Sequence, residues 1–130
     1  IRRGGRPLAE DPVWALRLAK AEADVRIHEW SVLRVLSGES SRFPVTAGAS
    51  VLKLRGSELQ QSITELHLDL MGARSLRDFG VEPWLEPSSE GWPNIVPGRV
   101  SKAMMARAAT IYGGSKQIQK NILAKLALGL

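Results

Sequence analysis

The residues best placed to do chemistry in this chain are Gly113, Gly114 and Ser115, which join two runs of apolar residues at helical spacing. Either glycine can adopt a positive φ and let a ligand approach the backbone, and Ser115 is a good N-cap for the helix that follows. The first-turn amides of that helix would carry partial positive charge and would suit an anionic or electron-rich ligand. The same three residues also make an ordinary helix-turn-helix corner, and the pattern alone favours that plainer interpretation.

Few other side chains are placed for catalysis or metal binding. The chain has no cysteine, which excludes disulfides, thiolate metal sites and cysteine nucleophiles. His28 and His67 have no second histidine or carboxylate at metal-ligand spacing, so we expect no metal site. No serine lies in a nucleophile elbow, and no loop of the P-loop or dinucleotide-binding type is present. The sequence therefore argues against an ATPase and against a Rossmann dehydrogenase.

The composition is that of one soluble globular domain, with 130 residues of which 44% are hydrophobic and 24% charged. The net charge is +5, but Lys and Arg are spread among acidic residues, so we predict no nucleic-acid binding. No apolar run is long enough to span a membrane and the N-terminus lacks the apolar core of a signal peptide, so we predict a cytoplasmic protein without a membrane anchor. Because the chain begins at Ile1 rather than at a methionine, we expect further sequence upstream.

Four amphipathic helices must position the Gly113–Ser115 turn. Asp11 is the predicted N-cap of the first helix and Gly72 the predicted C-cap of the second. The helices are expected at residues 12–37, about 46–71, about 98–112 and 115–126. On the third helix the side chains expected to point inward are Val100, Met104, Ala108 and Ile111. These elements predict an all-α fold, a four-helix up-and-down bundle, with no convincing strand pattern.

The segment at residues 73–97 interrupts the helical pattern. It contains four prolines together with Ser88, Ser89 and Gly91, so it cannot form one helix. We predict a long loop, with Trp84 and Trp92 as apolar anchors that hold it on the surface. The whole chain, residues 1–130, is then a single helical domain.

The sequence around the turn resembles a known family. Residues 107–122, which read RAATIYGGSKQIQKNI, together with Leu128-Gly129-Leu130, are similar to the C-terminal signature of the acyl-CoA dehydrogenases, which are FAD enzymes. Residues 5–8 (GRPL), 49–54 (ASVLKL) and 58–61 (ELQQ) also look like that family, so the resemblance covers nearly the whole chain.

This resemblance implies a function for the whole protein. The chain would be the C-terminal helical domain of a larger flavoprotein, an oxidoreductase that oxidises the Cα–Cβ bond of an acyl-CoA thioester and passes electrons to an electron-transfer acceptor. The domain alone is expected to be inactive. Homo-oligomerisation, as a dimer or tetramer, follows from the resemblance, and in isolation an uncovered apolar face should cause self-association.

The resemblance also implies roles for five residues of the turn. Ser115 occupies the position of a family Thr or Ser that hydrogen-bonds the flavin. Gln117 falls in the first helical turn, where it can reach a cofactor phosphate or ribose hydroxyl, and Gly114 permits the close approach of FAD. Tyr112 and Gly113 would line the acyl side of the pocket, although a tyrosine at a helix end is also commonly a half-buried packing residue.

Gly113 departs from the family pattern in a way that matters for catalysis. Many members carry at this position a Glu that removes the α-proton of the acyl-CoA, and glycine cannot act as a base. No catalytic residue is therefore assigned. The alternative to an active enzyme is a non-catalytic helical subunit that serves assembly in such an enzyme. Glu58 and Glu65 are explained by capping, solvation or i,i+4 pairing rather than by catalysis.

Two further positions differ from the family. Asp69 stands where typical members carry a Gln that helps hold the adenine end of FAD. Arg2 and Arg3 stand near an Arg that the family places at the start of this domain, and they could meet a pyrophosphate or simply form a flexible basic terminus.

Overall fold

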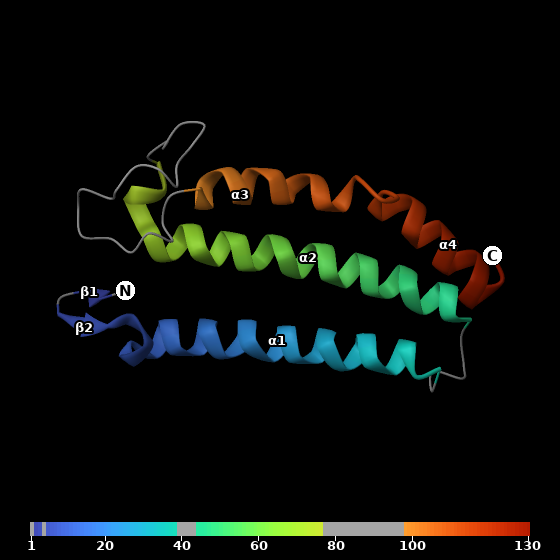
Figure 1. The fold of residues 1–130 in the computed structure, drawn as a ribbon, viewed down its shortest axis with the longest axis horizontal. Coiled ribbons are helices and arrows are strands. Elements are labelled where there is room, and N and C mark those ends of the chain that lie inside the picture. The colour runs from blue at the N-terminus through green and yellow to red at the C-terminus, as the bar shows by residue number, and fades with distance from the viewer. Residues whose placement is uncertain (1, 4, 39–43, 77–97) are drawn as a thin grey trace.

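The computed structural model describes residues 2–3, 5–38, 44–76 and 98–130, and its helices lie in three rows (Figure 1). The first row is α1 (Pro12–Leu36), the second is α2 (Val45–Met71), and the third is formed by α3 (Arg99–Ala106) and α4 (Lys116–Leu128), which follow one another end to end. Helix α2 is the middle row and packs against α1, α3 and α4. The all-α fold with four helices is confirmed.

Short elements complete the described chain. Strands β1 (Arg2–Arg3) and β2 (Arg6–Pro7) pair antiparallel in a small hairpin, which the sequence did not predict. Three 3₁₀ helices follow or precede the long helices, namely η1 (Leu8–Glu10), η2 (Gly72–Leu76) and η3 (Arg107–Thr110). The predicted loop at 73–97 begins with η2. Its residues 77–97, with Trp84 and Trp92, lie outside the described part of the chain.

Two predicted helix caps are confirmed, Asp11 at the start of α1 and Gly72 at the end of α2, because local capping geometry fixes them. The Asp11 carboxylate accepts hydrogen bonds from the Val13 and Trp14 amides at 2.9 and 3.3 Å, and Pro12 occupies the first turn. Gly72 ends α2 with a φ of +59°.

The interface between the second and third rows is built from small residues. Ala103, Ala106 and Ala109 are each only 3% exposed, and on α2 the buried side chains include Ser57 and Thr64. Because η3 has three residues per turn, the spacing of three keeps these alanines on one side of the row even after the α-helix has ended. Small side chains let the two rows approach closely.

The prediction of which side chains of the third helix point inward is therefore largely wrong. Met104 and Ile111 are 60% and 69% exposed, Ala108 is also exposed, and Val100 is half-buried. The prediction assumed one α-helix to residue 112 and placed the larger residues inside. The α-helix ends instead at Ala106, and the alanines occupy the contact with α2.

Helix α1 carries an apolar face that the other described rows leave uncovered. Leu16 is 72% exposed and Trp30 is 66% exposed, and Val13, Ile27 and Leu33 are exposed on the same side of the helix. The side of α1 that meets α2 includes His28, which lies against Gly56, and Val35, which lies against Gly48. No helix in the described ranges has both the length and the apolarity of a membrane span.

Candidate functional site

The Gly113–Ser115 turn lies between η3 and α4 and has the backbone geometry that the sequence predicted. Gly113 and Gly114 have φ values of +63° and +88°, in the left-handed region that favours glycine. Ser115 is extended and its hydroxyl oxygen accepts a hydrogen bond of 3.3 Å from the Ile118 amide, so it caps α4. We call residues 112–117 the glycine corner.

All five residues predicted for cofactor or substrate binding lie in the glycine corner. Tyr112 is 59% exposed, Gly113 and Gln117 are exposed, and Gly114 and Ser115 are half-buried. Tyr112 is thus not a packing residue within the described chain. A Cβ placed on Gly113 would meet no atom within 4 Å, so the space beside it is open to a ligand.

Lys53 of α2 binds the glycine corner on the side that faces α2. Its Nζ atom donates hydrogen bonds to the carbonyl oxygen of Gly114 at 2.7 Å and to that of Ala109 at 3.1 Å. These two carbonyls lie on either side of the turn from η3 to the corner. The lysine therefore joins the end of η3 and the start of α4 to the middle row.

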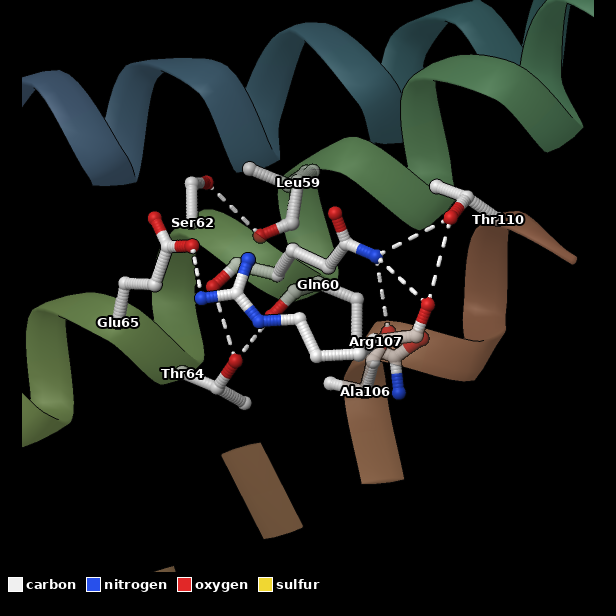
Figure 2. A network of polar contacts seen from close by, with 9 residues as sticks. Leu59, Gln60, Ser62, Thr64, Glu65, Ala106, Arg107 and Thr110 are labelled. Atoms are coloured by element: carbon white, nitrogen blue, oxygen red, sulfur yellow. Dashed lines mark hydrogen bonds and ion pairs between the residues drawn. The ribbon is translucent and has the colours of Figure 1, made fainter. Parts of the chain in front are cut away.

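Gln61, two helical turns further along α2, makes a second attachment. Its Nε2 atom donates to the carbonyl oxygens of Ala106 at 3.0 Å and Arg107 at 3.3 Å, and approaches the Thr110 hydroxyl at 3.4 Å. Figure 2 shows Arg107 reaching from the third row to Glu65 of α2, at 2.7 Å, beside these contacts. The end of α3 is thus fixed to α2 by a network of side chains.

Glu58 forms an ion pair with Lys116 in the first turn of α4, with 2.5 Å between Glu58 Oε1 and Lys116 Nζ. Arg55 lies 3.6 Å from the same carboxylate. The hydrogen bond from Lys116 is the main cause that lowers the pKa of Glu58 below its usual 4.5. The sequence predicted capping, solvation or local pairing for Glu58 and Glu65. Glu58 does pair locally with Arg55, but both carboxylates also pair with the third row, which the sequence did not predict.

The lowered pKa of Glu58 gives a pH-dependent contribution to stability. A carboxyl whose folded pKa lies below its unfolded value stabilises the fold fully above about pH 4.5, and this stabilisation is lost as the pH falls through the folded pKa. We expect Glu58→Gln to lower the free energy of unfolding at pH 7 by about 0.3–1 kcal/mol, because the pair is partly exposed to solvent. The variant should also show a weaker loss of stability below pH 4.5.

Urea titrations monitored by circular dichroism from pH 3 to pH 7 would measure both effects. Glu22→Gln is the matched control, since its carboxylate is exposed and, among the described residues, pairs only with Arg26 on the same helix, at 4.0 Å. If the free energy of unfolding falls as steeply below pH 4.5 in Glu58→Gln as in the control, the role of the pair is contradicted.

Glu58 also borders a groove of about 360 Å³ between α1 and α2. The groove is lined by Lys20, Asp24, Ile27, His28, Ser31, Val51, Leu52, Arg55, Glu58, Leu59 and Ser62. Its walls mix both signs of charge with aliphatic side chains. The groove is thus amphipathic and carries no excess of one charge that would favour an anion or a cation.

The structure does not bring Asp69 to the glycine corner. Asp69 lies 16 residues beyond Lys53 on α2, roughly 24 Å along the helix axis at 1.5 Å per residue. Its carboxylate is bound by Arg17 of α1, whose guanidinium lies 4.6 Å from the centre of the Trp14 ring. Asp69 therefore has a structural partner between the first two rows.

Arg2 and Arg3 also lie away from the corner, in the hairpin near the start of α1 (Figure 1). The Arg2 guanidinium donates a hydrogen bond of 2.9 Å to the Gly5 carbonyl oxygen, which closes the hairpin turn. The two positions thus form a structured hairpin rather than a flexible terminus.

The two histidines are not part of a metal-ligand cluster. Across the ranges that the structure describes, no three His, Cys, Asp or Glu side chains are grouped so as to hold a metal ion. His67 is half-buried, and burial, with Arg99 and Lys102 nearby, lowers its pKa. His28 packs against Gly56 at the contact between α1 and α2.

The sequence missed Lys53 and Gln61 as supports of the corner. Both lie in segments that were noted only for resemblance, and their partners are main-chain carbonyls at least 45 residues away. One signal was available in the sequence. Lys53, Ser57 and Gln61 recur at a spacing of four and so share one side of α2, and polar residues on a side that is buried need hydrogen-bond partners.

Comparisons with known proteins agree on one family. The family described as "Acyl-CoA dehydrogenase, C-terminal domain" matches residues 2–128. The protein named acyl-CoA dehydrogenase IpdE1, from Mycobacterium tuberculosis strain H37Rv, is 28% identical over 122 residues, which cover 94% of this chain and 28% of that protein. Acyl-CoA dehydrogenase FadE26, from the same organism, is 30% identical over an alignment of 133 positions, covering 98% of this chain and 30% of that protein. The chain spans less than a third of the length of these curated relatives. No solved structure matches it.

Proposed function

The chain belongs to the acyl-CoA dehydrogenase family, and we propose that it is the C-terminal domain of an FAD-dependent enzyme that oxidises the Cα–Cβ bond of an acyl-CoA thioester. The single observation that supports this best is the glycine corner, because the stretch that resembles the family's C-terminal signature is also an accessible turn with two positive-φ glycines and a capping serine. The domain would contribute to holding FAD and the acyl-CoA rather than act alone.

The residues of the corner fit a flavin cofactor. Gly113 offers no side chain to hinder a planar ring, and the space beside it is open. A Cβ on Gly114 would lie only 2.5 Å from Gln119 Nε2, so the absence of a side chain at Gly114 makes room for the Gln119 side chain. The Ser115 hydroxyl accepts from the Ile118 amide, so its own hydrogen is free to be donated to a cofactor atom. Gln117, exposed in the first turn of α4, would reach a phosphate or ribose hydroxyl. Bound FAD would supply the hydride acceptor.

The described residues do not supply a catalytic base at the corner. Gly113 has no side chain, and Glu58 is ion-paired with Lys116, so its lowered pKa makes it a weak acceptor of a proton. The α-proton would therefore be removed by a carboxylate from another part of the enzyme or from another subunit. The corner would bind and orient the substrate, with Tyr112 and Gly113 beside the acyl chain.

A second candidate is a non-catalytic subunit that serves assembly. Gly113, in the place where many family members carry their catalytic Glu, favours it. In either case we propose a homo-oligomer, because Leu16, Trp30 and their neighbours on α1 form an exposed apolar face. An electron-transfer acceptor would complete the reaction of the active form.

The complete gene product that contains this chain would decide between the two candidates. Its visible spectrum shows whether flavin is bound, and bleaching by a panel of acyl-CoA thioesters with a dye acceptor shows turnover. Bound flavin that bleaches supports the dehydrogenase. Bound flavin that no thioester bleaches supports the assembly subunit, and a colourless protein that does not take up FAD would contradict the proposed cofactor.

Ser115→Ala tests the cofactor role of the corner directly. We expect the variant to release FAD about tenfold more readily, since one hydrogen bond to a cofactor atom contributes about 0.5–1.5 kcal/mol and the cap of α4 is weakened as well. Flavin retention after gel filtration, with circular dichroism to verify the fold, would measure this.

Asp11→Ala is the matched control for Ser115→Ala. It removes an N-cap that accepts two amide hydrogen bonds, but at the start of α1, far from the corner (Figure 1). If both variants lose flavin equally, loss of a helix cap explains the result and the specific role of Ser115 is wrong.

A further inference from the structure

Lys53 is placed unusually for a lysine in the middle of a helix. Its side chain is half-buried between the second and third rows and both of its hydrogen-bond partners are main-chain carbonyls, those of Gly114 and Ala109. Within the described ranges no carboxylate pairs with this ammonium. Desolvation of a charged group is unfavourable unless bonds compensate it, so the two carbonyl bonds are what this lysine gains in the folded protein.

The hydrogen bond from Lys53 to the Gly114 carbonyl oxygen fixes the orientation of the Gly114–Ser115 peptide, which glycine alone would leave free to rotate. Gly114 is followed by Ser115, and the Gly114 carbonyl and the Ser115 N–H belong to the same planar trans peptide. These two groups point in opposite directions, so an ammonium on the oxygen directs the N–H away from α2. A glycine can accommodate either orientation of the next peptide, and the 2.7 Å bond from Lys53 selects one.

The same bond also changes the electronic character of that peptide. A positive charge on a carbonyl oxygen polarises the peptide and makes its N–H a stronger donor. The Ser115 N–H makes no hydrogen bond with the described residues, and the Ser115 hydroxyl beside it retains a free hydrogen. Lys53 thus directs the Ser115 N–H away from α2, and the hydroxyl of the same residue is a second donor at the corner.

We propose that Lys53 is a positioning residue of the cofactor site, which sets the orientation of the Gly114–Ser115 peptide and strengthens Ser115 as a donor to the bound flavin. This inference rests on the proposed function, since it assigns a cofactor to the corner. It assigns no contact between Lys53 and the cofactor, because the ammonium lies behind the peptide.

Gln61 provides an internal comparison. It also extends from α2 to main-chain carbonyls of the third row, at 3.0 and 3.3 Å, but these belong to Ala106 and Arg107 at the end of α3. Figure 2 shows this part of the network, in which Ala106, Arg107 and Thr110 face α2. Loss of Gln61 therefore removes an attachment of the third row without removing the bond to Gly114.

The experiment compares Lys53→Met with Gln61→Leu in the complete gene product. The measurements are the dissociation constant of FAD from reconstitution of the apoprotein, the position of the visible flavin band and the melting temperature of the apoprotein. We expect both variants to melt at lower temperature. Only Lys53→Met should bind FAD about tenfold more weakly, with a shifted band in the remaining bound flavin, while Gln61→Leu should bind within about twofold of the wild type.

Lys53→Arg keeps the charge and the ability to donate to both carbonyls, so it should recover most of the affinity and the wild-type band position. If Lys53→Met does not fold, the comparison is made instead between Lys53→Arg, which keeps the charge, and Lys53→Gln, which removes it. A wild-type affinity and band in Lys53→Gln would then overturn the inference.

The outcomes separate this inference from the proposed function. If wild type binds FAD and Lys53→Met binds it equally well with an unshifted band, Lys53 is only structural and the inference alone is wrong. Equal losses of affinity in Lys53→Met and Gln61→Leu would likewise mean that Lys53 is only structural. If the wild type takes up no FAD, the proposed cofactor fails and the inference fails with it.

Discussion

Replacing Ala106 by leucine should lower the melting temperature of the protein by about 3–15 °C. Ala106 is 3% exposed at the contact between α3 and α2, and its own carbonyl accepts a bond from Gln61. A leucine adds three carbon atoms where two helices approach closely. Overpacking of this kind costs about 1–3 kcal/mol, and each kcal/mol shifts the melting temperature of a domain of this size by roughly 3–5 °C.

Ala108→Leu is the control for this prediction. Ala108 lies two residues further along the same row and is exposed, so the same change there should alter the free energy of unfolding by less than about 0.5 kcal/mol. Thermal unfolding followed by circular dichroism at 222 nm would compare the two variants. Equal melting temperatures would show that the rows are not in close contact at Ala106.

The second large effect concerns association through α1. We expect the double substitution Leu16→Glu and Trp30→Glu to convert an oligomer into a monomer or a lower oligomer. Both side chains are mostly exposed in the single chain, at 72% and 66%, and lie on one side of the helix. Placing two carboxylates in a buried apolar contact would leave them without partners, which costs several kcal/mol in association.

Sedimentation velocity over a hundredfold range of concentration would measure the change. Val25→Glu is the matched control, because Val25 is also an exposed apolar residue of α1, yet 100° per residue places it on the opposite side of the helix. A wild type that sediments as a monomer at all concentrations would contradict the proposed oligomer. Dissociation by Val25→Glu as well would mean that the apolar face is not the contact.

The parts of the fold that could be predicted are those fixed by local chemistry. Asp11 and Ser115 cap the helices that follow them because their side-chain oxygens reach amides two or three residues away. Gly72, Gly113 and Gly114 take positive φ where a helix ends or turns. Each of these contacts lies within a few residues of sequence, so pattern rules contain the necessary information.

The parts that could not be predicted depend on partners distant in sequence. Lys53 and Gln61 bond to carbonyl oxygens, which every residue carries, so nothing in the sequence identifies the recipients. The prediction of which side of the third row faces α2 was also wrong. Met104 lies within α3 and was placed inside because it is large and apolar, although the buried positions of this helix hold alanines. Ile111 lies beyond Arg107, where the change from α-helix to 3₁₀ helix alters the number of residues per turn, so a single helical period misplaces it.

The middle position of α2 has a consequence for how the domain loses its order. Both outer rows rest on this helix, and the attachments of the glycine corner, through Lys53 and Glu58, belong to it as well. Cooperativity therefore resides in α2: fraying at the end of α4 can remain local, whereas melting of α2 releases both rows and the corner together. We therefore expect the domain to unfold as a single thermodynamic unit built around one helix rather than as a pair of independent hairpins.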